Sequence, residues 1–287
     1  MRVSLTQSPL HWWIEIELIL NLSLEAESWS NMTTRTPPYN SRPTQSYSIH
    51  VKHAKACIIV IHEVWGLNQY VRHVCKRLSK LGFAAIAPNL YSRNQELFTP
   101  QNIKDAMAAV WKIPLKDRFS ANSLDRVLSQ KRSPQRVANL LTLLYSRKFR
   151  RRMLSDLKSF ADYAFTRYGK VAAIGFSMGG GLSFKLAAEC PKFSGCISFC
   201  GEAPNPNELT KIDSPMLLIC AGQDRFMNSK VPDFVRETLK QTKELTLKVY
   251  GNARHEFFNE MNKHYYDRNT TQDAWSAAQT FLKEVFR

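Results

Sequence analysis

The sequence Val171-Ala-Ala-Ile-Gly-Phe-Ser-Met-Gly-Gly-Gly-Leu-Ser-Phe-Lys-Leu-Ala-Ala188 is the most informative segment of the chain. A short apolar run, typical of a buried strand, leads into Gly-x-Ser-x-Gly at Gly175, Ser177 and Gly179, and a small-residue, helix-like segment follows. A bare Gly-x-Ser-x-Gly is also compatible with a glycine-rich turn and a capping serine. The flanking strand and helix patterns favour a nucleophile elbow, a sharp turn that exposes the serine hydroxyl and requires neighbours without side-chain bulk.

Strand and helix patterns alternate outward from this segment. We expect strands at 47–51, 56–62, 83–88, 171–176, 195–200, 216–221 and 245–250, and helices at 71–81, 182–190, 231–240 and 273–286. Most of the central strands are continuously apolar, which is typical of a parallel sheet that is covered by helices on both faces. The sequence therefore predicts an α/β fold.

The exception to the alternation is the segment 94–168, which holds several helix patterns and no convincing strand. Between residues 116 and 152 it carries eleven basic residues against Asp117 and Asp125. Its place before the elbow strand predicts a lid-like helical insert over the carboxyl ends of the strands. The run 147–152 is compatible with a nucleic-acid patch, but it lacks interleaved aromatic residues, so a solvated helix face is the favoured interpretation.

Composition limits the class of protein. The chain has 287 residues and 44% hydrophobic content, which excludes a disordered chain and allows a full core. Its net charge of +16 is compatible with nucleic acid, an anionic surface or anionic substrates, and does not choose among them. The six cysteines form no Cys-x-x-Cys pair, so we expect reduced core residues and a cytoplasmic protein.

The first 46 residues differ from the rest and are expected to form an N-terminal extension to a domain at 47–287. The apolar stretch 12–20 is interrupted by Glu15 and Glu17 and is too short to cross a bilayer, so it resembles neither a membrane span nor a signal peptide. Met32 opens a segment that looks like an ordinary protein start. Residues 1–31 are thus either an appended leader or an arm that packs on the domain or on a partner subunit.

A nucleophilic serine needs a base and a residue that orients the base. Asp224 follows the strand 216–221, and His255 follows the strand 245–250, so both lie in loops at carboxyl ends, where sites of α/β sheets gather. The remaining histidines considered, at positions 11, 50, 53, 73 and 264, lack this placement. We therefore expect His255 to take the proton of Ser177 and Asp224 to hold the imidazole. The dipeptide at 62–63 does not continue to His-Glu-x-x-His, because position 66 is glycine, so no metal site is expected.

Five segments together resemble the dienelactone hydrolase (carboxymethylenebutenolidase) family of α/β-hydrolases, in a variant with a serine nucleophile. They are Ile61-His-Glu-Val-Trp-Gly-Leu-Asn68, the run 81–93, the elbow, Gly222-Gln-Asp224 and His255-Glu-Phe257. The resemblance covers most of 48–287 and leaves out the first 47 residues and the basic insert. It implies an α/β-hydrolase fold and hydrolysis of a small ester or lactone without a metal or an organic cofactor.

The resemblance also implies roles for single residues. Glu63 matches the family's acidic residue that contacts the resting nucleophile, Val64 would give its N–H to the oxyanion, and Arg93 matches an arginine that binds a substrate carboxylate. We assign Trp65 to substrate binding as well. Where the family prototype has a second carboxylate-binding arginine, this chain has Asn259, so carboxylate-bearing lactones are expected to be mediocre substrates.

The elbow supplies the second oxyanion donor. Met178 follows the serine at the start of the expected helix, and its N–H is expected to donate to a developing oxyanion with help from the helix dipole. The sequence thus predicts a serine hydrolase that forms an acyl-enzyme on Ser177. The alternative is a non-catalytic hydrolase-fold protein that binds an anionic partner through its basic insert. The physiological substrate and the oligomeric state stay open.

Overall fold

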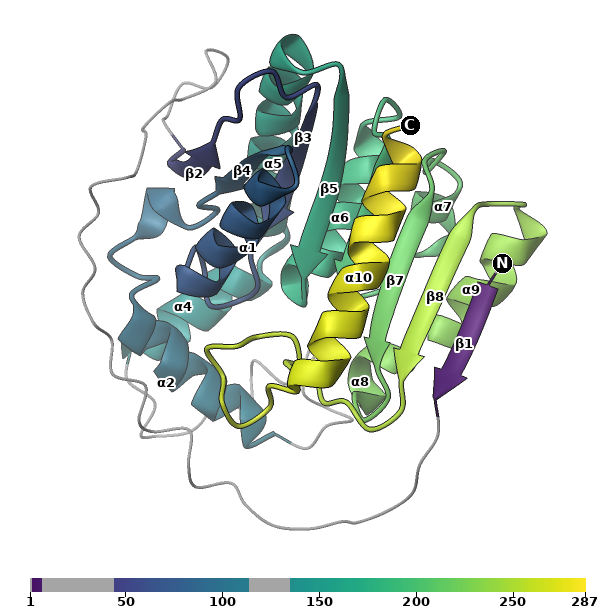
Figure 1. Cartoon of the computed structure of the whole chain (residues 1–287). Coiled ribbons are helices and arrows are strands. Elements are labelled where there is room, and N and C mark those ends of the chain that lie inside the picture. The colour runs from purple at the N-terminus through teal and green to yellow at the C-terminus, as the bar shows by residue number, and fades with distance from the viewer. Residues whose placement is uncertain (1, 7–43, 114–134) are drawn as a thin grey trace.

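The computed structural model describes residues 2–6, 44–113 and 135–287 (Figure 1). The strands are β1 (Arg2–Thr6), β2 (Ser46–Ile49), β3 (Ala56–Ile61), β4 (Ala84–Pro88), β5 (Lys170–Phe176), β6 (Gly195–Phe199), β7 (Met216–Ala221) and β8 (Leu245–Tyr250). The helices are α1 (Gln69–Lys80), η1 (Ser92–Asn94), α2 (Pro100–Trp111), α4 (Gln135–Tyr145), α5 (Arg147–Arg167), α6 (Met178–Glu189), α7 (Pro206–Leu209), α8 (Arg225–Asn228), α9 (Val231–Lys240) and α10 (Arg268–Val285).

The described strands form one sheet in the order β1-β8-β7-β6-β5-β3-β4-β2. Only β2, which pairs with β4, runs antiparallel within this described sheet. The chain proceeds from β3 outward to β4 on one side and from β5 outward to β8 on the other, so the strand order reverses between β3 and β5. Such a reversal opens a crevice at the carboxyl ends of the two strands, where α/β proteins place their ligands. The predicted α/β class and mostly parallel sheet are confirmed.

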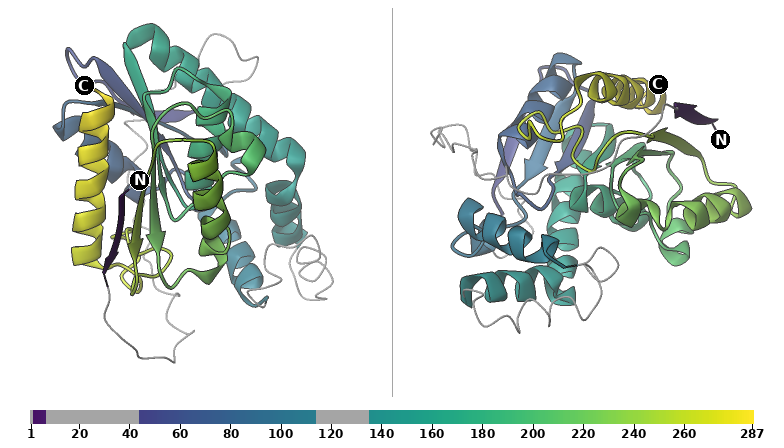
Figure 2. Two further views of the ribbon diagram at one scale, coloured as in Figure 1. Left: turned by 90° about the vertical axis from the view of Figure 1, so that its right-hand side faces the viewer. Right: turned by 90° about the horizontal axis from the view of Figure 1, so that it is seen from below.

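The sheet is buried on both faces. In β3, Cys57, Ile59 and Ile61 join one hydrophobic cluster, and Ile58 and Val60 join the other, as expected when successive side chains point to opposite faces. α1 and α10 cover one face and α5, α6 and α9 the other, and the left view of Figure 2 shows the sheet between these two layers. Burial of both faces explains why the central strands lack polar alternation.

The expected insert at 94–168 has two parts in the structure. α5 is a covering helix of the sheet, because Phe149, Met153, Leu157 and Phe160 bury an apolar stripe against the cluster on that face. α2 and α4 contact each other and lie beside the carboxyl ends of the strands (Figure 1). Of the described helices of the insert, only α2 and α4 thus lie where the sequence predicted a lid, whereas α5 covers a face of the sheet. The basic residues of 114–134 lie outside the described residues.

The N-terminal extension contains a strand that the sequence analysis did not predict. β1 pairs in parallel with β8, from Arg2 beside Thr246 to Thr6 beside Tyr250. The apolar segment at 12–20 and the start at Met32 lie outside the described residues, so the division of the chain at residue 46 stays a prediction. Within the described part, no helix is long and apolar enough to cross a membrane.

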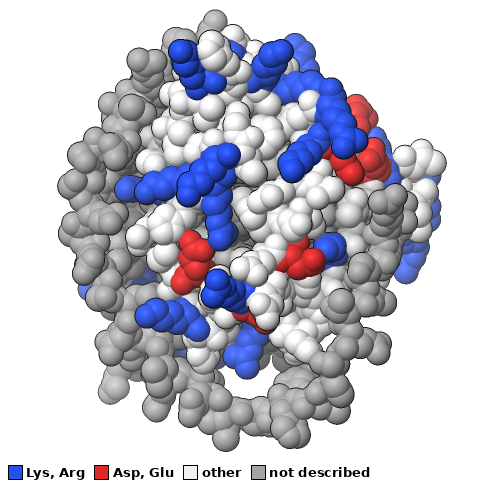
Figure 3. Space-filling view, in the orientation of Figure 1, with Lys and Arg blue, Asp and Glu red and all other residues white. Residues whose placement is uncertain are grey.

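Basic residues are spread over the one face that Figure 3 shows. On the face that α1 and α10 cover, Lys and Arg side chains are dispersed among uncharged residues with few Asp and Glu (Figure 3). Several of the cations there are engaged: Arg77 lies over the Trp275 ring and Arg72 over the Tyr47 ring. This face does not show the continuous basic stripe that phosphate backbones favour.

Candidate active site

The turn from β5 to α6 is a strained elbow. Ser177 has a φ of 50° and a ψ of −114°, a conformation that side chains rarely adopt. A Cβ on Gly175 would lie 1.9 Å from the Gly179 carbonyl oxygen, and one on Gly179 would lie 2.3 Å from the Ile61 carbonyl oxygen. Both positions therefore require glycine, since backbone atoms of the same elbow and of β3 occupy the space. This crowding is the physical reason for the Gly-x-Ser-x-Gly spacing.

Ser177, His255 and Asp224 lie together, as the sequence predicted. The Ser177 Oγ lies 2.7 Å from the His255 Nε2, and the His255 Nδ1 bonds to the Asp224 Oδ2. The second Asp224 oxygen accepts a bond from the Met227 N–H at 3.1 Å, which fixes the carboxylate at the start of α8. The Ser177 hydroxyl, the His255 imidazole and the Asp224 carboxylate thus form one continuous hydrogen-bonded chain, the geometry that nucleophilic catalysis by a serine requires.

The surroundings of His255 favour a basic imidazole. Burial acts to lower the pKa of His255, but the hydrogen bond and charge of Asp224, together with the charge of Glu256, outweigh it and leave the pKa raised. The sequence did not single out Glu256, although it is the immediate neighbour of His255. A raised pKa makes the imidazole a better proton acceptor toward Ser177.

The two expected oxyanion donors follow neighbouring strands. β3 pairs with β5 up to Ile61 beside Gly175, so the Val64 loop and the start of α6 lie at the same edge of the sheet. Met178 is the first residue of α6, so its N–H lies at the positive end of the helix dipole. The Tyr91 hydroxyl donates to the Val64 carbonyl at 3.1 Å and so anchors the loop.

His62, for which the sequence suggested no role beyond a metal ligand, is fully buried beside this loop. Its Nε2 accepts a bond from the Leu90 N–H at 3.2 Å, and its Nδ1 lies 2.6 Å from the Glu63 carbonyl oxygen. Burial lowers the pKa of His62 to about 4, against the opposing effect of the Glu63 carbonyl. In the sequence, the one signal of a structural role for His62 is its position directly before Glu63 and Val64, in the loop after β3.

Glu63 bonds to Asn259, whereas the partner of Ser177 is His255. The Asn259 Nδ2 donates to the Glu63 Oε1 at 2.8 Å, and the Asn259 Oδ1 accepts from the Met261 N–H at 3.0 Å. The other Glu63 oxygen is buried without a hydrogen-bond partner among the described atoms. Burial, reinforced by the charge of Glu256, raises the pKa of Glu63 well above its ordinary value, against the bond from Asn259. This environment therefore favours the neutral, protonated form of Glu63 over the charged form.

Trp65 joins the loop after β3 to the loop after β8. Its Nε1 donates to the Glu256 Oε1 at 3.1 Å, and the Asn262 Nδ2 donates to the Glu256 Oε2 at 2.5 Å. The Trp65 ring also meets the Trp111 ring of α2 edge-on, with 5.8 Å between centroids. The loop at 62–68 thus contacts both the histidine loop and the helical insert.

Arg93, the expected carboxylate anchor, is engaged within the protein. Its Nη2 bonds to Thr44 Oγ1 at 3.2 Å and forms an ion pair with the Asp156 carboxylate of α5. The Arg152 Nη2 bonds to Asn94 at 2.6 Å, and its charge, like that of Arg93, acts on Asp156. The guanidinium that the resemblance offered to substrate is thus partly neutralised by a buried acid.

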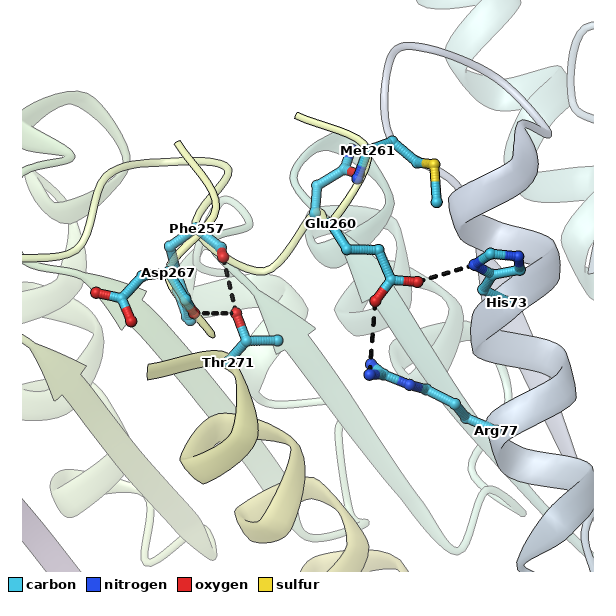
Figure 4. Close-up of polar contacts among 8 residues, drawn as sticks. His73, Arg77, Phe257, Glu260, Met261, Asp267 and Thr271 are labelled. Carbon is cyan, nitrogen blue, oxygen red and sulfur yellow. Dashed lines mark hydrogen bonds and ion pairs between the residues drawn. The ribbon is translucent and has the colours of Figure 1, made fainter. Parts of the chain in front are cut away.

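The loop that carries His255 is attached to two helices (Figure 4). Glu260 accepts a hydrogen bond from His73 at 2.8 Å and lies 3.5 Å from Arg77, so it ties the loop to α1. Three residues before Glu260, the Phe257 carbonyl accepts a hydrogen bond from the Thr271 hydroxyl at 2.8 Å, which links the loop to α10. These contacts tie the loop that carries His255 to two helices of the protein.

The described residues contain no group of three His, Cys, Asp or Glu side chains that could hold a metal ion. The arrangement instead offers a hydroxyl, an imidazole and a carboxylate at the carboxyl edge of a parallel sheet. A strained serine elbow with these partners on this sheet is the architecture of an α/β-hydrolase.

Comparison with known proteins identifies the family of α/β-hydrolases to which the chain belongs. The model of the dienelactone hydrolase family matches residues 45–286, and the chain belongs to this family. A protein of Saccharolobus solfataricus named "Putative carboxymethylenebutenolidase" is 37% identical over 234 residues, which cover 80% of this chain and 90% of that protein. The predicted family is confirmed, and membership supports a hydrolase of the ester or lactone type.

Solved structures of low sequence identity share the fold. A dienelactone hydrolase-like promiscuous phosphotriesterase from metagenomic libraries is 19% identical with a TM-score of 0.62, over 89% of this chain and 99% of that one. The dienelactone hydrolase from Anabaena variabilis is 16% identical with a TM-score of 0.56, over 88% of this chain and 97% of that one. At these identities the likeness extends to the fold alone.

Proposed function

We propose that this protein is a serine hydrolase that cleaves a small carboxylic ester or lactone through an acyl-enzyme on Ser177. The observation that carries the proposal is the 2.7 Å contact between the Ser177 Oγ and the His255 Nε2, with the other His255 nitrogen bonded to Asp224. Membership of the dienelactone hydrolase family supports the ester or lactone substrate class.

In the proposed reaction, His255 accepts the Ser177 proton while the Ser177 oxygen attacks the carbonyl carbon. The carbonyl oxygen becomes an oxyanion, to which the N–H groups of Met178 and Val64 donate. The imidazolium returns its proton to the leaving alkoxide as the carbon–oxygen bond breaks. Water then repeats the sequence on the acyl-enzyme, and the products are an acid and an alcohol, or a hydroxy acid from a lactone.

Thiols are poor candidates for the nucleophile. All six cysteines are free and buried. Burial raises the pKa of Cys220 to about 12, and it raises the pKa of Cys200 well above its ordinary value, with the charge of Asp224 acting in the same direction on both. A buried thiol held in its protonated form is a weak nucleophile. The free thiols also support our proposal of a reducing, cytoplasmic location.

We propose that neutral substrates are preferred over carboxylate-bearing ones. Arg93 shares its charge with Asp156, and Asn259 uses both polar side-chain atoms on Glu63 and Met261. Trp65 directly follows Val64 in the proposed oxyanion loop, and we retain it as a substrate-contacting residue; its ring meets the Trp111 ring of α2 edge-on. Glu63, being buried and bonded to Asn259, supports the loop in this proposal rather than the nucleophile.

The alternative function, binding of an anionic partner through the basic insert, is favoured by one observation. Four cations at the start of α5, namely Arg147, Lys148, Arg150 and Arg151, are exposed. Cations at the positive end of a helix dipole destabilise the helix, which an anionic partner would offset. This alternative requires no chemistry at Ser177 and is therefore separable by a chemical probe.

A fluorophosphonate probe tests the proposal directly. We expect wild-type protein to be labelled at Ser177 and a Ser177→Ala variant to remain unlabelled, with the site identified by mass spectrometry. Ser177→Ala and His255→Ala should each lower kcat for a p-nitrophenyl ester by about 10⁴ or more, with Asp224→Asn milder, while circular dichroism shows unchanged folding. Retained esterase activity in Ser177→Ala would refute the assignment.

A further inference from the structure

His62 makes two hydrogen bonds that define its tautomer. The Leu90 N–H can only donate, so the His62 Nε2 that it approaches at 3.2 Å must be an acceptor. A neutral imidazole whose Nε2 accepts carries its proton on Nδ1. The Nδ1 therefore donates to the Glu63 carbonyl oxygen, 2.6 Å away.

The Glu63 carbonyl and the Val64 N–H belong to the same peptide group. A trans peptide group is planar, with its C=O and N–H pointing in opposite directions, and none of the described peptide bonds is cis. Because His62 holds the oxygen on one side of this group, the Val64 N–H points to the opposite side. The orientation of the proposed oxyanion donor is thus fixed through the atom at the other end of its own peptide.

The tight turn that follows reinforces this orientation. The Gly66 N–H donates to the same Glu63 carbonyl at 3.1 Å, and Gly66 has a φ of 80°, which glycine adopts without strain. A Cβ on Gly66 would approach the Tyr91 ring at 3.2 Å. The Glu63 oxygen therefore accepts two bonds, of which the bond from His62 is the shorter.

We propose that His62 is a positioning residue that sets the direction of the Val64 N–H in the oxyanion hole. The inference rests on the proposed function, in which Val64 is an oxyanion donor. His62 acts through the Glu63–Val64 peptide and has no reacting atom of its own. Its low pKa, caused by burial, supports the role, because the imidazole stays neutral and keeps the same donor at the pH of ordinary catalysis.

Two variants separate the two hydrogen bonds of His62. In His62→Asn the amide nitrogen lies near the Nδ1 position and keeps the donor to Glu63, while the acceptor for Leu90 is lost. In His62→Gln the longer side chain reaches the Nε2 position and keeps that acceptor, while the donor to Glu63 is lost. Both variants remove the same ring from a buried site, so each controls for the packing loss of the other.

We expect kcat for a neutral p-nitrophenyl ester to fall about 10-fold or more in His62→Gln and less than about 3-fold in His62→Asn, with KM little changed in both. Affinity for a trifluoromethyl ketone, which forms an oxyanion on Ser177, should fall in parallel with kcat. Equal kcat in the two variants, or a loss that appears in KM alone, would overturn the positioning role.

A measurement on the wild-type protein needs no variant. Nitrogen-15 NMR of labelled histidine should show His62 neutral with its proton on Nδ1 from about pH 5 to 9. A proton on Nε2, or a charged imidazole in that range, would overturn the inference. Fluorophosphonate labelling separates failure of the proposed function from failure of the positioning role. An unlabelled Ser177 refutes the proposed function. A protein that is labelled at Ser177 but carries the His62 proton on Nε2 refutes the positioning role alone.

Discussion

Arg93 and Asp156 form an ion pair that joins the loop after β4 to the middle of α5, and the Asp156 side chain is only 2% exposed. Burial raises the pKa of Asp156, against the charges of Arg93 and Arg152. Burial of the Asp156 carboxylate therefore carries a desolvation penalty, which the attraction to the guanidinium groups of Arg93 and Arg152 must offset.

Arg93→Ala should lower the free energy of unfolding by about 3 kcal/mol, because it leaves the Asp156 charge buried with Arg152 as the remaining cation that acts on it. Adding Asp156→Asn should recover most of this loss, since the buried charge is then removed. Urea denaturation of wild type, both single variants and the double variant measures the coupling. A double variant as unstable as Arg93→Ala would mean that Arg93 stabilises the fold through other contacts.

If His255 is the base of the proposed mechanism, the decrease of kcat/KM at acidic pH, the acid limb, should report the pKa of His255. The base must be neutral to take the Ser177 proton, and its pKa is raised, so kcat/KM should fall as the pH drops through a value above the ordinary histidine pKa of about 6.5. Glu256→Gln removes one of the charges that raise this pKa and should shift the limb to lower pH. Glu260→Gln, a neighbouring acid that pairs with α1, is the matched control and should leave the limb in place. Identical limbs in all three proteins would contradict the electrostatic account.

Glu63→Gln should stabilise the protein in a pH-dependent way. The pKa of Glu63 is raised on folding, so between the unfolded and the folded pKa the native state holds a proton that the unfolded state releases. Wild-type stability should therefore decline relative to the variant by about 1.4 kcal/mol per pH unit above about pH 4.3, until the folded pKa is reached. Thermal unfolding at pH 4 and pH 8 compares the two. A difference in Tm that does not grow with pH would show that Glu63 is ionised in the native state.

Gly179→Ala should abolish folding or cost more than about 4 kcal/mol, since the new Cβ would lie 2.3 Å from the Ile61 carbonyl oxygen and neither backbone can move freely. Gly169→Ala is the control, because its Cβ would meet only the Lys55 carbonyl oxygen at 3.8 Å, an ordinary contact. Expression level and urea denaturation are the measurements. A stable Gly179→Ala protein would show that the elbow has another backbone path.

A chain that starts at Met32 should fold and keep its esterase activity, because Ser177, Asp224 and His255 all follow strands later in the sequence. Such a chain lacks β1, so the edge of β8 is left without its partner, and we expect concentration-dependent self-association. Light scattering and kcat measure the two effects. An insoluble or inactive product would mean that the first 31 residues cover surface that the fold needs.

Local sterics and chain order explain why the elbow, and the meeting of Ser177, Asp224 and His255 at one sheet edge, could be predicted from the sequence. Gly175 and Gly179 are required by atoms within a few residues or on the adjacent strand, so their spacing is visible in the sequence. Asp224 and His255 lie three and five residues after the ends of β7 and β8, and parallel strands bring their carboxyl ends to one edge. The expected ends of the strands accordingly differ from the observed ones by at most two residues.

The partners of the side chains around the site could not be predicted in this way. Glu63 bonds to a residue 196 positions away, Trp65 to one 191 positions away, and Arg93 pairs with an acid in a helix that the sequence assigned to a lid. Each contact depends on which surfaces meet when the loops after β3, β4 and β8 fold over one sheet edge, and no local periodicity encodes that. The linear order of residues therefore determines which side chains follow the strands and can meet at the sheet edge, whereas packing over that edge determines which of their charges are neutralised and which way the Glu63–Val64 peptide points.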